Sequence, residues 1–409
     1  MNAISAIRSN WKKTVFGLGL GAYGINYGHE WYQISSLMKS YSEKAVQYGD
    51  RCDVYPRKLI VILNPAANKK KAEKTFQKYC EPILHLAGFT VDIVRTDSEG
   101  HAKTYVEQLK SVPYGIVIAG GDGSVSEVLT GLMRRNTDHC PIALLPLGSK
   151  NETTKKMLNI NWDSKVNEVE ALLNASLNIA RETLEKKSIF KIEQIATESD
   201  EQQPAGRPIF SMGSLDWGIF RDIESLQSKY WYFWRADKYI GALINSFNSK
   251  LTWECKADVC YTTPCIGCNN CLVHNEVVAQ SQKSIFSRLF SRQLVSNSSK
   301  IVPMSDVECE QHNQQINASN IRIHVDNDKT SDNNKLVLES DKKIETGFDT
   351  FSKYLSEEKV FEMLKFRTMN FIPDGSCTGE SRVYSIDGEA YDVRPIKVTL
   401  VPKAVEIFV

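Results

Sequence analysis

The chain has 409 residues, of which 42% are hydrophobic and 10% are aromatic, so it is long enough to bury two or three domain cores. Its formal net charge is only +1, which argues against nucleic acid as a partner and against any general electrostatic attraction to acidic lipid. Ten cysteines in this length exclude a fold built on disulfides, and no fixed-period repeat indicates a fibre or a solenoid.

The first segment, residues 1–54, is basic and then apolar. The basic residues Arg8, Lys12 and Lys13 precede an uncharged run over 14–29. No acidic residue occurs before Glu30. This pattern is typical of a mitochondrial-type presequence or a signal anchor. The most apolar part, 15–27, is rich in glycine and shorter than the ~20 residues that span a bilayer. We therefore expect a retained targeting or membrane-associated segment, either peripheral or marginally inserted, rather than an ordinary buried helix.

Residues 55–185 alternate between strand and helix patterns. Short apolar runs predict strands over 58–63, 90–96, 114–119 and 142–145, with helices between them. Such alternation predicts βαβ units and a mostly parallel sheet, with ligands at the carboxyl ends of the strands. We expect an α/β nucleotide-binding domain here.

The turn after the third predicted strand is the most informative stretch of the chain. Gly120, Gly121, Asp122 and Gly123 stand between the apolar run and an amphipathic helix that begins at Ser124. Glycines let backbone N–H groups approach phosphate, and the first turn of a helix favours negative charge. Asp122 would repel phosphate, which indicates a metal ligand or a base that takes a proton from a hydroxyl. The alternative is an ordinary Gly-Asp-Gly turn.

Polar turn residues also follow two other predicted strands. Asn64 comes after the first strand, and Gly148–Asn151 come after the fourth. Because the carboxyl ends of parallel strands lie at one edge of a sheet, we expect these residues to converge with Gly120–Gly123 on one crevice. That convergence favours a functional interpretation of the Gly-Asp-Gly turn.

From residue 186 onward strand patterns dominate. Strands are expected over 190–195, 208–212, 321–325, 335–338, 366–372 and 396–401. We expect a β-rich, mainly antiparallel C-terminal domain in two parts, 186–278 and 321–409. The polar residues 279–320 between them predict a mobile insertion. Within it, 283–292 has the pattern of a basic amphipathic helix, which suits an anionic membrane or, alternatively, docking on its own domain.

Cys265, Cys268 and Cys271 lie at three-residue spacing in the first part of this domain. Three thiolates with one further thiolate or imidazole can complete a tetrahedral Zn²⁺ site. Clustered disulfides are the alternative in an oxidising compartment. Either arrangement would be structural.

Several of these motifs together resemble the diacylglycerol and sphingosine kinase catalytic family, whose members phosphorylate lipid hydroxyls with ATP. The resemblance rests on Asn64-Pro65, on Gly120–Ser124 with Glu127, and on Pro146-Leu147-Gly148. Within the family it is greatest to the mitochondrial acylglycerol kinases. The further matching pieces, which extend the resemblance over nearly the whole chain, are Trp11-Lys12-Lys13, residues 82–86, Arg134-Arg135 and residues 217–222.

Two positions depart from the family pattern. The family's nucleotide loop after Asn-Pro usually carries a glycine, whereas here Asn68 and Lys69–Lys71 follow. These lysines either contact phosphate or begin a solvated helix. The family's Gly-Thr-Gly-Asn is Gly148-Ser149-Lys150-Asn151 in this chain, and losing the second glycine changes how closely the backbone can approach a nucleotide.

The resemblance implies ATP as the phosphate donor, Mg²⁺ as the cation and three catalytic carboxylates. Asp122 and Glu389 are the two candidates for the base, with Asp387 near the metal on a tight Asp-Gly-Glu turn; the sequence does not decide between them. It also implies that Asp222, with Arg221, contacts the polar head of the lipid, the alternative being an ion pair. The nucleotide site is implied to contain Asn64, Thr96, Gly120, Gly121, Gly123, Ser124, Glu127 and Gly148.

The expected function is therefore a lipid kinase that converts mono- and diacylglycerol into lysophosphatidic and phosphatidic acid. By resemblance, its partners are the acylglycerol and the mitochondrial membrane, and its place is the inner membrane, facing the intermembrane space. One alternative is a kinase-independent component of the inner-membrane carrier translocase. Another is a NAD kinase, since Gly-Gly-Asp-Gly occurs there too; the Asn64-Pro65 turn, the Asp387–Glu389 turn and the membrane-directed N-terminus argue against it.

Overall fold

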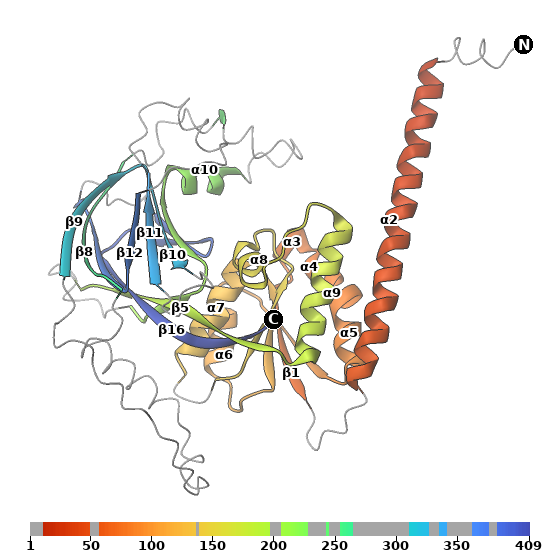
Figure 1. Cartoon of the computed structure of the whole chain (residues 1–409), viewed down its shortest axis with the longest axis horizontal. Helices are drawn as coiled ribbons and strands as arrows, with labels where there is room; N and C mark the ends of the chain where they lie inside the picture. Colours follow the sequence, from red (N-terminus) through yellow and green to blue (C-terminus); the bar gives the residue numbers. More distant parts are fainter. Residues whose placement is uncertain are drawn as a thin grey trace, which may run out of the picture.

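The computed structural model describes residues 11–49, 57–135, 139–196, 206–227, 243–244, 254–264, 311–326, 335–341, 362–375 and 383–409. Figure 1 shows an α/β part, in which helices surround a sheet, beside a β-rich part formed by later residues. The expected combination of an α/β domain with a mainly antiparallel C-terminal domain is confirmed.

Four parallel strands form the centre of the α/β part. They are β1 (Lys58–Leu63), β2 (Thr90–Arg95), β3 (Gly115–Gly120) and β4 (Ile142–Pro146), in the order β2-β1-β3-β4. β3 and β4 are buried at every position. Strands covered on both faces read as continuous apolar runs, which is why the sequence identified them without alternation.

Helices cover both faces of this sheet. On one face, Ile60 and Ile62 pack with α6 (His101–Glu107) and α7 (Asp122–Met133). Leu59 and Leu63 point to the opposite face, because side chains alternate along a strand. The helices that follow β1 and β4 are α3 (Ala67–Lys70), α4 (Ala72–Thr75), the π-helical turn η1 (Phe76–Cys80), α5 (Glu81–Leu86), α8 (Glu152–Leu158) and α9 (Lys165–Arg181).

The β-rich part contains two sheets. The six-stranded sheet is antiparallel throughout and has the order β12 (Glu362–Phe366), β11 (Lys335–Ser340), β10 (Asn320–Asp326), β7 (Ser214–Gly218), β14 (Val383–Ile386), β15 (Glu389–Asp392). The other strands are β5 (Leu184–Gln194), β6 (Ile209–Ser211), β8 (Cys255–Thr262), β9 (Gln311–Ala318), β13 (Thr368–Pro373) and β16 (Ile396–Phe408). Trp217, Phe371 and Tyr384 contact one another edge to face in the core between the two sheets.

β16 joins the two parts of the molecule. It pairs with β13 and β5 in antiparallel fashion, and near its end Ile407 lies beside Ile142 of β4 in parallel. One ten-stranded sheet therefore runs through both parts, and the C-terminus lies within the α/β part (Figure 1). The sequence ended this strand at residue 401 and placed a domain boundary at 185/186, which falls inside β5.

The strand expected over 366–372 is also wrong in detail. It is two strands separated at Arg367, and the two belong to different sheets. A one-dimensional apolar pattern does not reveal where a chain crosses from one sheet to the other. The expected cysteine site, Cys265, Cys268 and Cys271, and the amphipathic stretch 283–292 lie outside the described residues.

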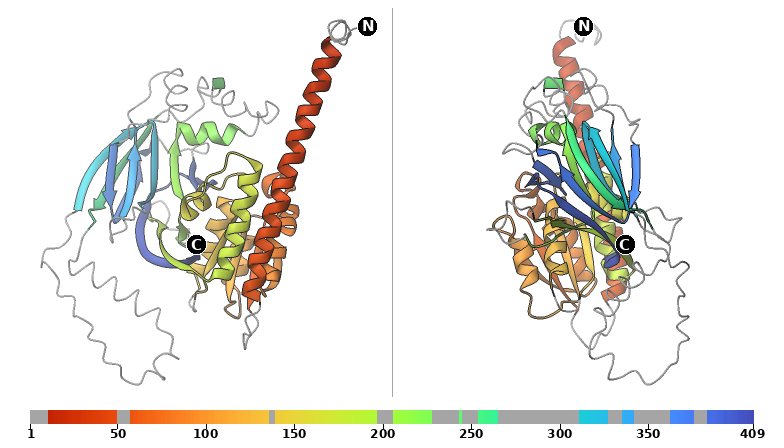
Figure 2. Two further views of the ribbon diagram at one scale, coloured as in Figure 1. Left: turned by 45° about the vertical axis from the view of Figure 1, so that its right-hand side comes forward. Right: turned by 90° about the vertical axis from the view of Figure 1, so that its left-hand side faces the viewer.

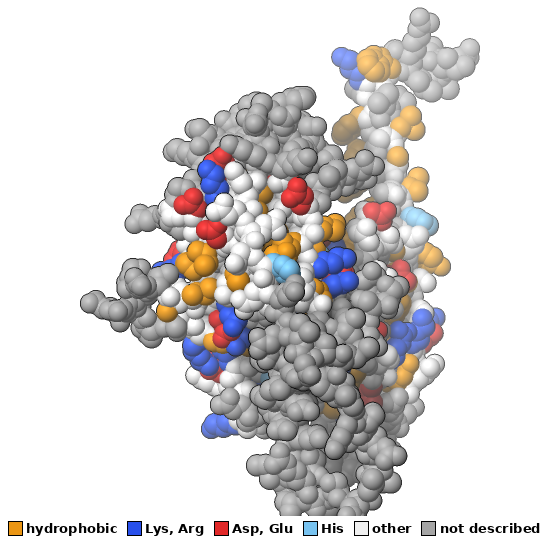
Figure 3. All heavy atoms as spheres, turned by 60° about the vertical axis from the view of Figure 1, so that its left-hand side comes forward, with side chains coloured by type: hydrophobic (Ala, Val, Ile, Leu, Met, Phe, Trp, Pro, Cys, Tyr) orange, Lys and Arg blue, Asp and Glu red, His pale blue; other side chains and the backbone are white. Residues whose placement is uncertain are grey.

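The N-terminal helix α2 (Trp11–Gly49) has two different halves. Its second half packs on α5 and α9 through Ile34, Tyr41 and Ala45, so it belongs to the α/β core rather than to a separate segment. The first half stands clear of the body (Figure 2) and carries apolar side chains on its surface (Figure 3). Those more than half exposed are Trp11, Phe16, Leu18, Leu20, Tyr23, Ile25, Tyr27, Trp31 and Tyr32. No helix among the described residues combines the length and hydropathy needed to cross a bilayer.

The short segment α3, which follows β1, contains three consecutive left-handed residues and is not a regular right-handed helix. Asn68, Lys69 and Lys70 have φ of 49°, 54° and 65°, although none of them is glycine. Lys69 and Lys70 are exposed, and the following helix begins only at Ala72. The solvated-helix interpretation of these lysines is therefore wrong at this point, because the chain turns with the opposite hand.

Replacing Lys70 with glycine is expected to raise the free energy of unfolding by about 0.5–1 kcal/mol. Glycine adopts positive φ without the steric cost of a Cβ atom, and this relief exceeds its entropic cost. The matched control is Lys71→Gly, where φ is −100°; there glycine is expected to destabilise by about 0.5–1 kcal/mol. Urea unfolding of both variants measures the two changes in the free energy of unfolding. A loss of stability in both would contradict the proposal that Lys70 is strained.

Candidate functional site

The turn from Gly120 to Ser124 joins β3 to α7 at the carboxyl edge of the sheet. Gly121 is the N-cap residue of α7 and has no side chain to cap it. Among the described residues, no protein acceptor is recorded for the N–H groups of Gly123 and Ser124. Two backbone donors and the positive end of the helix dipole are thus available to an anion.

The glycines of this turn admit neighbouring protein atoms. A Cβ atom on Gly120 would lie 2.5 Å from Ser124 Oγ, and one on Gly148 would lie 2.3 Å from Gly121 Cα. The Gly148 N–H donates to the Gly120 carbonyl at 3.0 Å. Gly120, Gly121 and Gly148 therefore converge as expected, but in the structure their small size lets two loops pack together. From the sequence, we had expected the small size of these glycines to let backbone N–H groups approach phosphate.

Asp122 is buried and holds the N-terminus of α8. Its Oδ2 accepts from Glu152 N at 2.9 Å, and its Oδ1 accepts from Thr153 N at 3.0 Å. Burial raises the pKa of Asp122, and these two N–H groups oppose that rise. Both carboxylate oxygens are thus engaged, which makes Asp122 a group that fixes α8 against α7.

The Asp387-Gly388 turn forms a two-residue hairpin between β14 and β15. Both residues have positive φ, 50° and 87°, which is the geometry that favours Asp-Gly in such turns. Asp387 Oδ1 accepts from Ser214 N at 3.1 Å. Glu389 Oε1 lies 3.0 Å from where a Cβ atom of Gly123 would be. The hairpin thereby places Glu389 against the first turn of α7.

The two carboxyl groups of this hairpin titrate near neutral pH. Burial raises the pKa of Asp387 to about 7, and the charge of Asp122 acts in the same direction. Burial also raises the pKa of Glu389 to about 7, opposed by the Tyr391 hydroxyl, which donates to Oε2 at 2.9 Å. No hydrogen bond to Glu389 Oε1 is recorded from the described part of the chain. Glu389 therefore has an oxygen that can accept a proton.

Comparison with known proteins agrees with this geometry. Residues 58–192 match the sequence profile of the diacylglycerol kinase catalytic domain. The chain is similar to "Acylglycerol kinase, mitochondrial" of Xenopus laevis (29% identity, covering 97% of this chain and 92% of the relative) and of Homo sapiens (28%, covering 98% and 95%). Over residues 58–192 the chain is thus similar to diacylglycerol kinase catalytic domains, and over nearly its whole length it is similar to the mitochondrial acylglycerol kinases.

A solved structure and a more distant relative extend this result. The crystal structure of a diacylglycerol kinase from Bacillus anthracis str. Sterne shares the fold, with a TM-score of 0.52 and 15% identity, covering 87% of this chain and 98% of that one. "Sphingoid long-chain bases kinase 1" of Arabidopsis thaliana is 31% identical over 44% of this chain and 22% of its own length. The resemblance to this lipid kinase family that the motifs indicated is confirmed.

The remaining nucleotide-site residues implied by the diacylglycerol kinase family have mixed positions. Asn64 and Thr96 lie at the carboxyl ends of β1 and β2, as expected, and Asn64 Oδ1 accepts from Ala66 N at 3.0 Å. Glu127 instead accepts from the N–H groups of Gly100 and Ala102, at 2.9 and 3.1 Å. Glu127 therefore caps α6, and it also borders the cavity of about 450 Å³ beside the hairpin.

Arg221 and Asp222 lie at the start of α10 (Ile219–Gln227) and pair with each other. Arg221 Nη1 is 3.0 Å from Asp222 Oδ1, and the two side chains are only 14% and 15% exposed. Arg221 lines a cavity, whereas Asp222 is not among its lining residues. Asp222 therefore forms a largely buried ion pair with Arg221, not the surface pair that was the alternative, and Arg221 is the member of the pair that borders the cavity.

Two cavities flank the Asp-Gly-Glu hairpin. The first, of about 100 Å³, borders Gly388 and Arg221. The second, of about 450 Å³, borders Glu389, Tyr391 and Glu127. The hairpin therefore borders two spaces, one on each side.

The available donors fit a nucleotide that arrives with Mg²⁺. The N–H groups of Gly123 and Ser124 suit phosphate oxygens, and Asp387 Oδ2 is buried without a hydrogen-bond partner. No three His, Cys, Asp or Glu side chains within the described ranges are grouped as a complete metal site. Mg²⁺ commonly takes only one or two carboxylates and keeps water and phosphate oxygens, so a sparse donor set is compatible with it. The described residues give no support to zinc.

Sequence reasoning missed Tyr391 and Lys150 as members of the site. Tyr391 stands two residues after Glu389 on β15, so the period-2 rule puts both on one face of the sheet and could have identified it. Lys150 was noticed only as a missing glycine, and nothing local in the sequence indicates what its side chain contacts.

Proposed function

We propose that the protein transfers the γ-phosphate of ATP to the hydroxyl group of mono- and diacylglycerol, giving lysophosphatidic and phosphatidic acid. The observation that carries this proposal is the approach of Glu389 to Gly123, because it puts a proton acceptor beside an anion-binding helix terminus. The match of residues 58–192 to the diacylglycerol kinase catalytic domain supports the reaction type, and the names of the frog and human relatives support the acylglycerol substrate.

In this mechanism each polar group has a separate task. The N–H groups of Gly123 and Ser124 and the α7 dipole hold the phosphates of ATP. Glu389 Oε1 takes the proton of the lipid hydroxyl. At the same time the hydroxyl oxygen forms a bond to phosphorus, and the bond between phosphorus and the ADP oxygen breaks. Asp122 keeps α8 and its loop in place. Mg²⁺, held by Asp387 and phosphate oxygens, would neutralise the negative charge that otherwise repels the attacking oxygen.

Competition between two acceptors tests the proposal. Wild-type protein is incubated with labelled ATP, Mg²⁺, NAD and monoolein in mixed micelles, and the products are separated. We expect the label in lysophosphatidic acid alone, because the first cavity has Trp217, Phe220 and Ile321 among its lining residues. Labelled NADP would favour the NAD kinase reading. If folded protein yields no labelled product at all, both enzyme hypotheses are overturned.

We further propose that the protein works at the mitochondrial inner membrane, facing the intermembrane space. The exposed apolar half of α2 supports contact with a membrane, and the relatives named above are mitochondrial by name. The same exposed surface favours the alternative role, a component of the inner-membrane carrier translocase. Co-purification of translocase subunits with wild type and with Asp122→Asn alike would support a role independent of catalysis.

A further inference from the structure

The smaller cavity beside the hairpin lies between the two parts of the molecule. On one side it is bordered by Lys150, from the loop after β4, and by Gly388 of the hairpin. On the other side it is bordered by α10 and by strands β7, β10 and β11. Its volume of about 100 Å³ suits a polar headgroup rather than a whole lipid.

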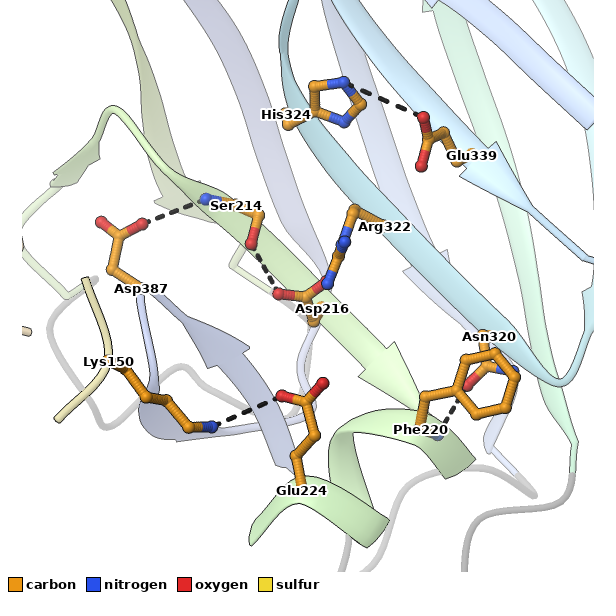
Figure 4. A network of polar contacts seen from close by, with 10 residues as sticks. All are labelled: Lys150, Ser214, Asp216, Phe220, Glu224, Asn320, Arg322, His324, Glu339 and Asp387. Carbon is orange, nitrogen blue, oxygen red and sulfur yellow. Dashed lines mark hydrogen bonds and ion pairs between the residues drawn. The ribbon is translucent and has the colours of Figure 1, made fainter. Parts of the chain in front are cut away.

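Three cations border this cavity, and their pairing differs. Arg221 is paired with Asp222 at 3.0 Å, and both side chains are largely buried. Arg322 is paired with Asp216, whose other oxygen accepts from Ser214 Oγ at 2.6 Å (Figure 4). Both arginines are therefore closely paired, and the hydrogen bond from Ser214 also holds Asp216 in place beside Arg322.

Lys150 has the weakest of these pairings. Its Nζ lies 3.4 Å from Glu224 Oε2 of α10, and the two side chains are 57% and 41% exposed. Figure 4 shows the two side chains meeting from different segments, and both residues line the cavity. An exposed lysine–carboxylate pair contributes little to stability, so its ammonium can exchange partners at small cost.

The main chain of Lys150 contacts the catalytic turn. Its carbonyl oxygen accepts from Asp122 N at 3.2 Å, directly next to the helix terminus assigned to phosphate. One residue thus touches the phosphate-binding turn through its backbone and the cavity through its ammonium.

We propose that Lys150 forms, with this cavity, a binding site for the phosphomonoester headgroup of the lipid product. The inference rests on the proposed lipid kinase function and adds a residue to it. Before transfer the acceptor is a neutral alcohol, and Lys150 stays with Glu224. After transfer the headgroup is a dianion, and the ammonium leaves Glu224 to form a charge-assisted hydrogen bond with a phosphate oxygen. A glycine at this position, as in the family pattern, has no such group.

Binding without nucleotide tests this site separately from catalysis. The probes are dodecyl phosphate, inorganic phosphate and 1-dodecanoylglycerol, titrated calorimetrically below their aggregation limits into the full-length protein. Lys150→Met is expected to weaken dodecyl phosphate binding about tenfold or more, which corresponds to about 1.4 kcal/mol. Lys150→Arg should retain most of the affinity, and Glu224→Gln should increase it by removing the competing carboxylate. Affinity for the neutral glycerol ester should change little with Lys150→Met.

Lys155→Met is the matched control, because it removes the same charge five residues further along the chain. The Lys155 ammonium lies over the Trp162 ring at 4.6 Å and is not among the lining residues of the cavity. It should leave dodecyl phosphate affinity unchanged. An equal loss in this control would reveal a general charge effect and overturn the proposal.

The remaining outcomes are also decisive. Unchanged affinity in Lys150→Met, or equal affinity for inorganic phosphate and dodecyl phosphate, would overturn a lipid-product site at Lys150. If wild type phosphorylates monoolein while Lys150→Met binds dodecyl phosphate normally, this inference fails and the kinase function stands. If wild type transfers no phosphate but Lys150→Met loses dodecyl phosphate binding, the kinase function fails and the anionic-lipid site stands.

Discussion

Replacing Glu389 with glutamine is expected to slow phosphate transfer to monoacylglycerol by about a hundredfold or more. Glutamine has nearly the same shape but cannot take a proton from the lipid hydroxyl. The three atoms nearest to the Cβ position of Gly123 outside its own chain segment all belong to Glu389, with Oε1 the nearest at 3.0 Å. Transfer from labelled ATP to monoolein measures the change in kcat, and the KM for ATP should stay close to that of wild type.

The pH dependence of wild type and variant provides the control. Because the pKa of Glu389 is raised to about 7, wild-type activity should rise as pH increases through about 7, where the carboxyl group loses its proton. The folded state favours the protonated form. The stability contributed by Glu389 is therefore fully present below about pH 4 and is lost as pH rises through about 7. Glutamine resembles the protonated carboxyl group, so the variant should lose less unfolding free energy over that range. A fully active variant with an unchanged pH profile would assign the proton transfer to another group.

Replacing Asp122 with alanine is expected to abolish transfer and to lower the free energy of unfolding by about 2 kcal/mol or more. The substitution leaves the N–H groups of Glu152 and Thr153 without their acceptor, and each unsatisfied buried donor costs about 1–3 kcal/mol. The loop before α8, including Gly148, then loses its anchor. Urea unfolding and the monoolein assay measure the two effects together.

Asp122→Asn and Ser164→Ala are the companion variants. An asparagine retains one acceptor oxygen but presents an NH₂ group where the second oxygen was, so it should cost less stability than alanine while still losing activity. Ser164 caps α9 by accepting from Asn167 N at 3.2 Å, away from the site. Its alanine variant should lose about 1 kcal/mol of stability with unchanged transfer. If Asp122→Ala were as stable as wild type, the anchoring role would be wrong.

Local rules predicted the parts of the fold that depend on neighbouring residues. The burial of β3 and β4 on both faces follows from their uninterrupted apolar composition. The tight turn at Asp387-Gly388 follows from the ease with which these two residues adopt positive φ. The same rules failed at 366–372 and at the end of β16, because an apolar run does not record which strand lies beside it.

The sequence by itself determined that Asn64, Gly120–Ser124 and Gly148 lie at one edge of a parallel sheet, since each follows a strand in a strand–turn–helix pattern. Only the tertiary structure decided which carboxylate oxygens already have hydrogen-bond partners. Asp122 is occupied because α8, 30 residues later, offers it two N–H groups. Glu389 retains an available oxygen because the pairing of β14 with β7 sets its hairpin over Gly123. Hydrogen-bond partners so distant along the chain follow from packing, which no local pattern encodes.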